Sequence, residues 1–298
     1  HVKSLVVEAV KTNGYVVLNA DDPMTVQAAK RVRSSIIYFS KQEDNLVIHK
    51  HLAEGGIAVF LKGGHITIAT GDGFIQVLPI SRIPATYDGK LVYNIENSLA
   101  AVGVAYAMKI PVETIQKALS SFYTDELQNP GRFNVFNIRD FRVVVDYAHN
   151  ITGYSHTIEA AKKMGASRII GIIGVPGDRD DNTIKRIGHM SGKSFDHIII
   201  KEDEDLRGRC RGEVAELLKE GALNAGMDPR NIQVILSEVR ALRTAMKNAK
   251  AGDLIIIFYE NFEPVIAAIK DAVFNLEHTA KRYRDGEKQD MILSATKL

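Results

Sequence analysis

The second half of the chain alternates short apolar runs with longer amphipathic segments. Five apolar runs fall at residues 141–146, 168–173, 197–201, 233–236 and 254–258. Helical patterns lie between and after these runs, near residues 154–164, 183–195, 211–225, 237–249 and 263–275. Strands separated by helices of this length predict a mostly parallel sheet with right-handed crossovers, and therefore an α/β fold.

The first half begins with the same alternation and then changes character. Strands are predicted at residues 15–18 and 35–39, and helices at residues 2–10, 24–33, 94–108 and 112–121. From residue 46 to residue 78, glycine-rich turns separate short alternating runs, which predicts hairpins that form a β-meander along one edge of a sheet. A polar segment closed by Pro130 then predicts a boundary between one domain at residues 1–128 and another at residues 129–298.

Composition places the chain among ordinary folded proteins. Its 298 residues are 45% hydrophobic and 25% charged, with a formal net charge of +2. This charge gives no general attraction for nucleic acid, and no apolar run approaches the ~20 residues of a membrane helix. The one cysteine, Cys210, excludes a disulfide framework and a cysteine-built zinc site. We find no signal-peptide pattern and expect a cytoplasmic protein; the missing initiator methionine indicates a fragment.

Polar clusters directly follow four of the predicted strands in the second half. They occupy residues 146–150, 174–180, 202–207 and 259–261. Ligands of open α/β sheets collect beyond the carboxyl ends of the strands, so these clusters predict a ligand site at one rim of the sheet. Any single cluster is more typical of a solvated turn, but four together favour a binding site.

Each cluster offers side chains with a definite chemistry. The Asp146 carboxylate could accept from a ribose hydroxyl or from a magnesium-bound water. His149 could donate to a phosphate or move a proton, although a lone histidine is more often an ordinary loop residue. Asp178 and Asp180 could bind an ammonium group, beside glycines whose N–H groups could approach an anion. The acids at residues 202–205 predict a pocket for a guanidinium group, with a plain acidic loop as the alternative.

One segment imitates a phosphate-binding motif. The letters SGKS at residues 191–194 match the end of the P-loop pattern GxxxxGK[ST]. The spacing fails, because the first glycine should stand at Ile187 and Gly188 comes one residue late. The segment also falls within a predicted helix, and no other GK[ST] occurs in the chain, so we find no P-loop.

Five motifs occur in the order typical of the Mur ligase superfamily, the ATP-dependent amide ligases of cell-wall and folate metabolism, which the chain resembles. They are LNADDP at 18–23, NIENSLAA at 94–101, NPGRF at 129–133, VDYAHN at 145–150 and GVPGDRD at 174–180. A longer segment, IIIKEDEDLRGRCRGEVAELL at 198–218, is similar to the carboxy-terminal part of the cyanophycin synthetase family. This resemblance implies a truncated Mur-ligase central domain followed by a Rossmann-like α/β carboxy-terminal lid domain.

The same resemblance implies roles for individual residues. Asn97 corresponds to the asparagine that contacts adenine, Arg132 to an arginine that reaches the nucleotide, and Asp146 to an aspartate near the ribose. Lys3 aligns with a lysine that many Mur ligases carbamylate to position a second magnesium ion, and we expect catalytic roles for Lys3 and His149. The predicted contacts to the incoming amino acid are Asp178, Arg179, Asp180, Glu202, Asp203, Asp205 and Arg207.

The implied reaction is amide ligation through an acyl phosphate, with ATP and Mg²⁺ as cofactors. Aspartate, arginine and the cyanophycin polymer are the implied partners, in a homo-oligomer without nucleic acid or membrane. Because the P-loop and the ATP-grasp region of that family are absent from the sequence, we expect this chain alone to be inactive. It would then be a fragment of a synthetase, a degenerate module for oligomerisation, or a binding protein for arginine or the polymer.

Overall fold

The computed structural model describes residues 4–274 of the chain. They fall into two compact units that meet between Thr124 and Asp125, and each unit is described by itself. Both units are α/β, as the sequence predicts. Within the described residues, no helix is long and apolar enough to cross a membrane.

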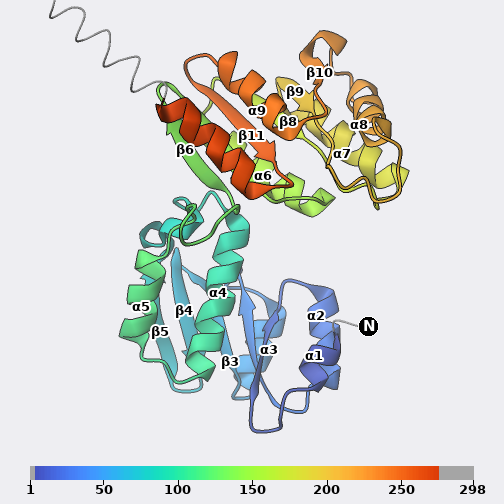
Figure 1. The fold of residues 1–298 in the computed structure, drawn as a ribbon. Helices are drawn as coiled ribbons and strands as arrows, with labels where there is room; N and C mark the ends of the chain where they lie inside the picture. The colour runs from blue at the N-terminus through green and yellow to red at the C-terminus, as the bar shows by residue number, and fades with distance from the viewer. Residues whose placement is uncertain (1–3, 275–298) are drawn as a thin grey trace, which may run out of the picture. The chain divides into compact units, whose positions relative to one another are not determined.

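The first unit contains a five-stranded sheet in the order β1-β2-β3-β4-β5 (Figure 1). The strands are β1 (Tyr15–Asn19), β2 (Ser35–Ser40), β3 (Ile57–Lys62), β4 (His65–Thr70) and β5 (Gly73–Pro79). The first three are parallel to one another, whereas β3, β4 and β5 are joined antiparallel. The predicted meander is therefore present at the β5 edge of the sheet.

Helices cover both faces of this first sheet. They are α1 (Leu5–Glu8), α2 (Pro23–Ala28), α3 (Leu46–Ala53), α4 (Val92–Ala107) and α5 (Val112–Ser121). One apolar core joins α4 and α5 to the sheet through residues such as Leu99 and Ile115. A second core, around Ile48 and Phe60, packs α1, α2 and α3 against the opposite face.

The prediction of strand structure at the start of the 46–78 segment is wrong. Residues Leu46–Ala53 form α3 because Asn45 caps the helix, accepting from the backbone N–H groups of Val47 at 2.9 Å and Ile48 at 3.3 Å. Ile48 is fully buried, and the apolar spacing of the segment fits a short helix as well as a strand.

The second unit contains a six-stranded sheet in the order β10-β9-β8-β11-β7-β6. The strands are β6 (Asn134–Ile138), β7 (Phe141–Asp146), β8 (Arg168–Ile173), β9 (His197–Ile200), β10 (Ile232–Val234) and β11 (Asp253–Phe258). All neighbours pair in parallel except β6, an edge strand that pairs antiparallel with β7. The mostly parallel sheet is confirmed, and β6 is an addition that the sequence analysis did not predict.

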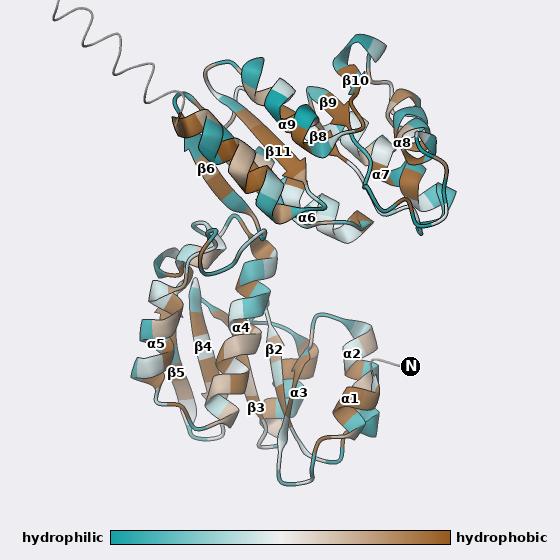
Figure 2. Cartoon of the chain, in the orientation of Figure 1, coloured by the Kyte–Doolittle hydropathy of each residue, from teal (hydrophilic) through white to brown (hydrophobic). Residues whose placement is uncertain are grey.

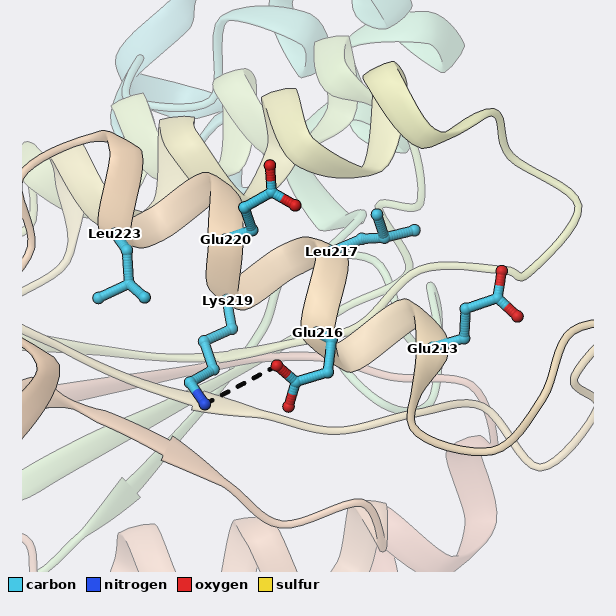
Figure 3. Close-up of a pocket in the computed structure, with 6 residues that line it drawn as sticks. All are labelled: Glu213, Glu216, Leu217, Lys219, Glu220 and Leu223. Atoms are coloured by element: carbon cyan, nitrogen blue, oxygen red, sulfur yellow. Dashed lines mark ion pairs between the residues drawn. The ribbon is translucent and has the colours of Figure 1, made fainter.

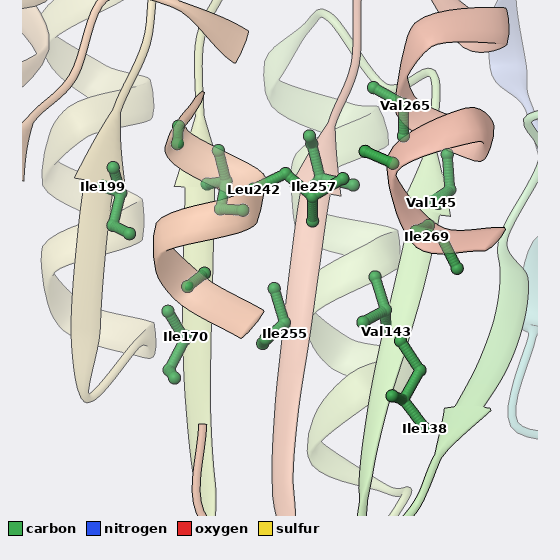
Figure 4. Packing of buried hydrophobic residues seen from close by; sticks show 14 of the residues in the cluster. Ile138, Val143, Val145, Ile170, Ile199, Leu242, Ile255, Ile257, Val265 and Ile269 are labelled. Carbon is green, nitrogen blue, oxygen red and sulfur yellow. The ribbon is translucent and has the colours of Figure 1, made fainter. Parts of the chain in front are cut away.

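Two layers of helices enclose the second sheet. The helices are α6 (Ile151–Lys162), α7 (Asp181–Ser194), α8 (Glu213–Asn224), α9 (Glu238–Lys247) and a last helix over residues 262–274. Side chains from alternate positions of the strands, including Val143 and Ile255, pack against α9 and the last helix (Figure 4). In Figure 2 the strands of this sheet are apolar along most of their length, as expected for strands buried on both faces.

Helices α7 and α8 cross at very short range. A Cβ atom at Gly188 would lie 2.1 Å from the Leu218 carbonyl oxygen, and one at Gly221 would lie 2.1 Å from the Lys185 carbonyl oxygen. A Cβ atom at Gly192 would similarly lie 2.8 Å from the carbonyl oxygen of Ala222. The glycine of the SGKS segment therefore serves helix packing, and the rejection of this segment as a P-loop agrees with its place inside α7.

An ion pair fixes the amino ends of two central strands of the second sheet. Arg168 at the start of β8 forms two hydrogen bonds with the buried carboxylate of Asp253, at 3.1 and 2.6 Å. Burial alone would raise the pKa of Asp253, but the bonds from Arg168 and from the Lys250 backbone N–H outweigh it and lower the pKa. The ionised form is therefore stabilised in the folded protein.

This lowered pKa predicts a pH-dependent contribution to stability. The contribution is present above the ordinary aspartate pKa of 3.8 and is lost as the pH falls through the lower pKa of the folded state. We expect Asp253→Asn to reduce the free energy of unfolding by about 2 kcal/mol at pH 7 and by less near pH 3. Urea denaturation of both proteins at the two pH values measures this, and a difference that does not change with pH would contradict it.

Candidate functional site

Four loops meet along one edge of the second sheet. Because β9, β8, β11 and β7 are parallel neighbours, their carboxyl ends all point to this edge, which we call the rim. The rim comprises residues 146–150, 174–180, 201–207 and 259–261. The structure therefore brings together the four polar clusters on which the predicted ligand site was based.

Asp146 ends β7 as a buried anchor for the loops beside it. Its carboxylate accepts from the backbone N–H groups of Phe133 and Ala148, each at 2.9 Å, and from the Thr157 hydroxyl at 3.1 Å. Burial raises the pKa of Asp146, while these hydrogen bonds and the charge of Arg132 oppose the rise. With three internal donors on its two oxygens, Asp146 is engaged in holding the NPGRF turn against the sheet.

The NPGRF turn places Arg132 beside two tyrosines. Its guanidinium carbon lies 4.8 Å from the centre of the Tyr147 ring, and the Tyr147 and Tyr259 rings are 5.4 Å apart. Gly131 has a φ of +71°, and a Cβ atom there would lie 1.9 Å from the Tyr259 hydroxyl oxygen. Burial raises the pKa of Tyr259 to about 12, although the charge of Arg132 opposes the rise, so the phenol is neutral at physiological pH. Arg132 is an exposed residue.

The remaining residues predicted for the nucleotide and for catalysis lie in different parts of the chain. His149 is partly exposed, its Nδ1 is 3.1 Å from the Tyr147 carbonyl oxygen, and its ring is 5.1 Å from the Tyr147 ring. Asn97 lies in the first unit, on α4, where its exposed amide donates to the Asn94 side chain at 3.2 Å. Lys3 lies outside the described residues. The structure thus groups His149 with Arg132 and Asp146 on one unit.

Asp178 and Arg207 form an exposed pair at the rim. Arg207 Nη1 lies 2.9 Å from the Asp178 carboxylate, and Arg207 Nε lies 3.7 Å from that of Asp205. The hydrogen bond from Arg207 lowers the pKa of Asp178, so this carboxylate is ionised at neutral pH. Both side chains remain more than 40% exposed, which leaves their outer edges available to a ligand.

The other residues of the GDRD segment have structural partners. Asp180 caps α7, accepting from the backbone N–H of Thr183 at 2.9 Å and from its hydroxyl at 2.7 Å. Arg179 donates nothing from Nε within the described residues, although this atom is buried. Its carbonyl oxygen accepts from Arg209 at 2.7 Å.

Glu202 and Asp203 have partners that differ from the expected guanidinium ligand. Both are buried: Glu202 accepts from the N–H groups of Gly212 at 2.7 Å and Ala215 at 3.0 Å, and so caps α8. Asp203 lies 2.7 Å from the ammonium group of Lys201. A carboxylate that already holds a helix terminus or a buried ammonium has little capacity left for a substrate. This geometry favours structural roles for these two residues. Of the residues predicted in this loop, it leaves Asp205 and Arg207 exposed.

Lys201 was not predicted as a site residue, yet it lies at the rim, directly after β9. Its side chain is 1% exposed, and its Nζ is 2.7 Å from Asp203 and 2.8 Å from Glu238. Burial alone would lower the pKa of Lys201, but the two carboxylates outweigh it and raise the pKa, so the amine is charged. The sequence does contain a signal for this residue, because a lysine at the end of an apolar run stands directly before EDED. Nothing in the sequence indicates that its partner is Glu238, 37 residues later.

Three shallow cavities lie on the second unit near the loop that follows β9. One of about 480 Å³ is bounded by charged groups of both signs, which are Glu202, Glu204, Arg211, Glu238 and Arg240. A neighbouring one of about 490 Å³ includes Cys210, an exposed thiol whose backbone N–H donates to Glu213 at 3.1 Å. A third, of about 440 Å³, runs along the outer face of α8, where Lys219 pairs with Glu216 (Figure 3). Its side chains come from one helix alone, so we assign it no site.

No metal site is assigned. Among residues 4–274, no three His, Cys, Asp or Glu side chains are grouped so that they could hold a metal ion.

The family comparison agrees with the fold of the second unit. Residues 131–258 match the model of the family described as Mur ligase, glutamate ligase domain. This segment of the chain is therefore similar in sequence to that domain family. The matched segment contains the rim residues 146–150, 174–180 and 201–207, and the loop at 259–261 follows it directly.

Curated relatives confirm the predicted resemblance over both units. The cyanophycin synthetases of Geminocystis herdmanii and Crocosphaera subtropica are 39% and 37% identical to the chain over 90% of its length. A diaminopimelate-adding ligase of Alkaliphilus metalliredigens is 28% identical over 81% of the chain and 45% of its own length. The chain spans about 30% of the length of the two cyanophycin synthetases and corresponds to their carboxy-terminal part.

Solved structures show the same fold at lower identity. A murein peptide ligase from Psychrobacter arcticus has a TM-score of 0.58 at 21% identity, covering 91% of this chain and 53% of that one. The MurF ligase from Thermotoga maritima, solved in complex with ADP, has a TM-score of 0.58 at 17% identity over 92% of this chain and 57% of that one. Both units therefore have the α/β fold seen in these Mur ligase structures.

Proposed function

We propose that the chain is the carboxy-terminal portion of an ATP-dependent amide ligase of the cyanophycin synthetase type. The reaction joins arginine to the side-chain carboxylates of a poly-aspartate backbone through an acyl phosphate. The observation that carries the proposal is the 34–39% identity to cyanophycin synthetases over nine tenths of the chain, which includes the loop at residues 201–207. In this proposal the protein acts in the cytoplasm, as a homo-oligomer.

The two parts of the chain would take different tasks. Residues 1–128 would form part of the central domain, with Asn97 on the adenine and Lys3 toward the phosphates and magnesium. Residues 129–298 would form the lid, with Arg132 and His149 on the nucleotide side. Asp146 would contribute by holding the turn that carries Arg132, which is the role its hydrogen bonds support.

The amine would be held by the exposed part of the rim. A guanidinium group forms paired hydrogen bonds with a carboxylate, and Asp178 and Asp205 offer carboxylates beside Arg207, which in turn can bind the carboxylate of an amino acid. ATP would supply the phosphoryl group that activates the acceptor carboxylate, and Mg²⁺ would neutralise the charge of the phosphoryl group. The residues of this chain contribute alignment of the amine with the activated acyl group.

Arginine binding tests this assignment directly. Isothermal titration should show that the chain binds arginine, and that Arg207→Ala and Asp178→Ala each weaken binding about tenfold or more, because each removes a charged hydrogen bond at the ligand. Arg230→Ala is the control, since it removes another exposed Arg–Asp pair, with Asp228, elsewhere on the unit. Arginine binding that none of these variants changes, or no binding by the unaltered chain, would instead favour a non-catalytic module for oligomerisation or polymer binding.

A further inference from the structure

The loop at residues 202–207 is held by hydrogen bonds that the proposed reaction does not use. Two of its backbone N–H groups, those of Glu204 and Asp205, donate to the carboxylate of Glu260 at 2.7 and 3.3 Å. Glu260 follows β11, so the loop after β9 is held from a strand that is not its neighbour in the sheet. These two hydrogen bonds fix the backbone of the loop at the point where the loop leaves the buried interior.

Glu260 is itself held in place by Glu238. The Glu238 carboxylate accepts from the backbone N–H groups of Glu260 at 2.6 Å and Asn261 at 3.1 Å. The same carboxylate pairs with the buried ammonium group of Lys201 at 2.8 Å. A continuous chain of charged hydrogen bonds thus runs from Lys201 through Glu238 and Glu260 to the backbone of Glu204 and Asp205.

The 202–207 loop also packs closely against Gly177 of the loop that follows β8. A Cβ atom at Gly177 would lie 2.3 Å from the Leu206 carbonyl oxygen, and Arg209 donates to the Gly177 carbonyl oxygen at 2.7 Å. Arg207 takes a left-handed backbone conformation with a φ of +47°, which a non-glycine residue adopts only when its surroundings enforce it. A charged network built around the buried ammonium group of Lys201 is suited to enforcing one conformation.

We propose that Lys201 and Glu260 are positioning residues, which hold the 202–207 loop in the conformation that presents Asp205 and Arg207 to the incoming amine. This inference rests on the proposed function for the identity of the ligand. Two sets of contacts would hold the loop: the hydrogen bonds from its backbone to Glu260, and the ion pair between Lys201 and Glu238. Neither Lys201 nor Glu260 touches the amine.

The test compares arginine binding with loop protection in two variants. Lys201→Met removes the buried cation, and Glu260→Gln removes one of the two carboxylate oxygens that hold the loop. In each variant we expect the arginine Kd to rise about tenfold and the amides of Glu204 and Asp205 to exchange hydrogen about tenfold faster. Lys185→Met is the matched control, because it removes a 2.8 Å lysine–glutamate pair, with Glu220, on the exposed surface of α7 and α8.

The readouts separate positioning from general destabilisation and from failure of the proposed function. A structural role alone would lower the melting temperature but leave the arginine Kd and these two amides unchanged. If Lys201→Met does not fold, Glu260→Gln alone tests the positioning role. Glu260 is only partly buried, so this variant is expected to fold. If the unaltered chain binds no arginine, the proposed function fails, and unchanged exchange in Glu260→Gln then overturns the positioning role as well. Faster exchange with an unchanged arginine Kd also overturns it.

Discussion

Replacing Gly188 with alanine is expected to destabilise the second unit by about 3 kcal/mol. Alanine normally favours a helix over glycine by about 1 kcal/mol, but a methyl group here would meet the Leu218 carbonyl oxygen at 2.1 Å. Backbone atoms cannot rotate away, so α7 and α8 would have to move apart and lose their packing. Urea denaturation measures the change in the free energy of unfolding.

A second substitution at the same helix crossing should reveal coupling. Gly221→Ala on α8 meets the Lys185 carbonyl oxygen at 2.1 Å and should cost a similar amount alone. Once one methyl group has separated the helices, the other has room, so the double variant should cost clearly less than the sum of the two. The control is Gly71→Ala, where an added Cβ atom meets nothing within 4 Å and the change should stay within about 0.5 kcal/mol. Additive costs, or no cost at Gly188, would contradict the packing interpretation.

Asp146→Ala is expected to have the second large effect, also about 3 kcal/mol. The substitution leaves the N–H groups of Phe133 and Ala148 without their acceptor in the interior, and an unsatisfied buried donor is costly. Asp146→Asn keeps one oxygen acceptor and should lie between the wild type and the alanine variant. The free energy of unfolding is again the measured quantity.

The same aspartate variants distinguish two roles for this residue. If Asp146 holds the NPGRF turn, amide exchange at Phe133 should become faster in Asp146→Ala, and the resonances of Arg132 should shift with it. If Asp146 is instead mainly a ligand contact, the variant should fold with nearly wild-type stability and lose only nucleotide binding. A stability change below about 0.5 kcal/mol would exclude the anchoring role.

The parallel core of the second unit could be predicted from the sequence because its signal is local and repeated. The runs at residues 141–146 and 168–173 coincide with β7 and β8, since strands buried on both faces are continuous apolar segments. The edge strand β6 was missed because Asn134 and Asn137 interrupt its apolar pattern. The helix α3 was missed because eight residues are too few for the helical period to exceed the strand period.

The position of the candidate site could also be predicted from the sequence. Which of its residues have structural partners and which are exposed could not. Strand ends and loop composition were enough to place four clusters at one rim. They could not show that Glu202 faces the amino end of α8 whereas Asp205 faces solvent, because neighbouring residues of a loop differ only in where the chain turns them. The partner of Lys201, Glu238, comes from the helix after the next strand, and a contact over that distance depends on the tertiary fold.

The exposed thiol at Cys210 gives this protein a built-in attachment point for a spectroscopic probe. It is the single cysteine of the sequence and lies between Arg209 and Arg211, three residues after Arg207. A maleimide fluorophore would therefore label one known position without prior mutagenesis. Its emission would report movements of the adjoining loop at residues 202–207 in real time.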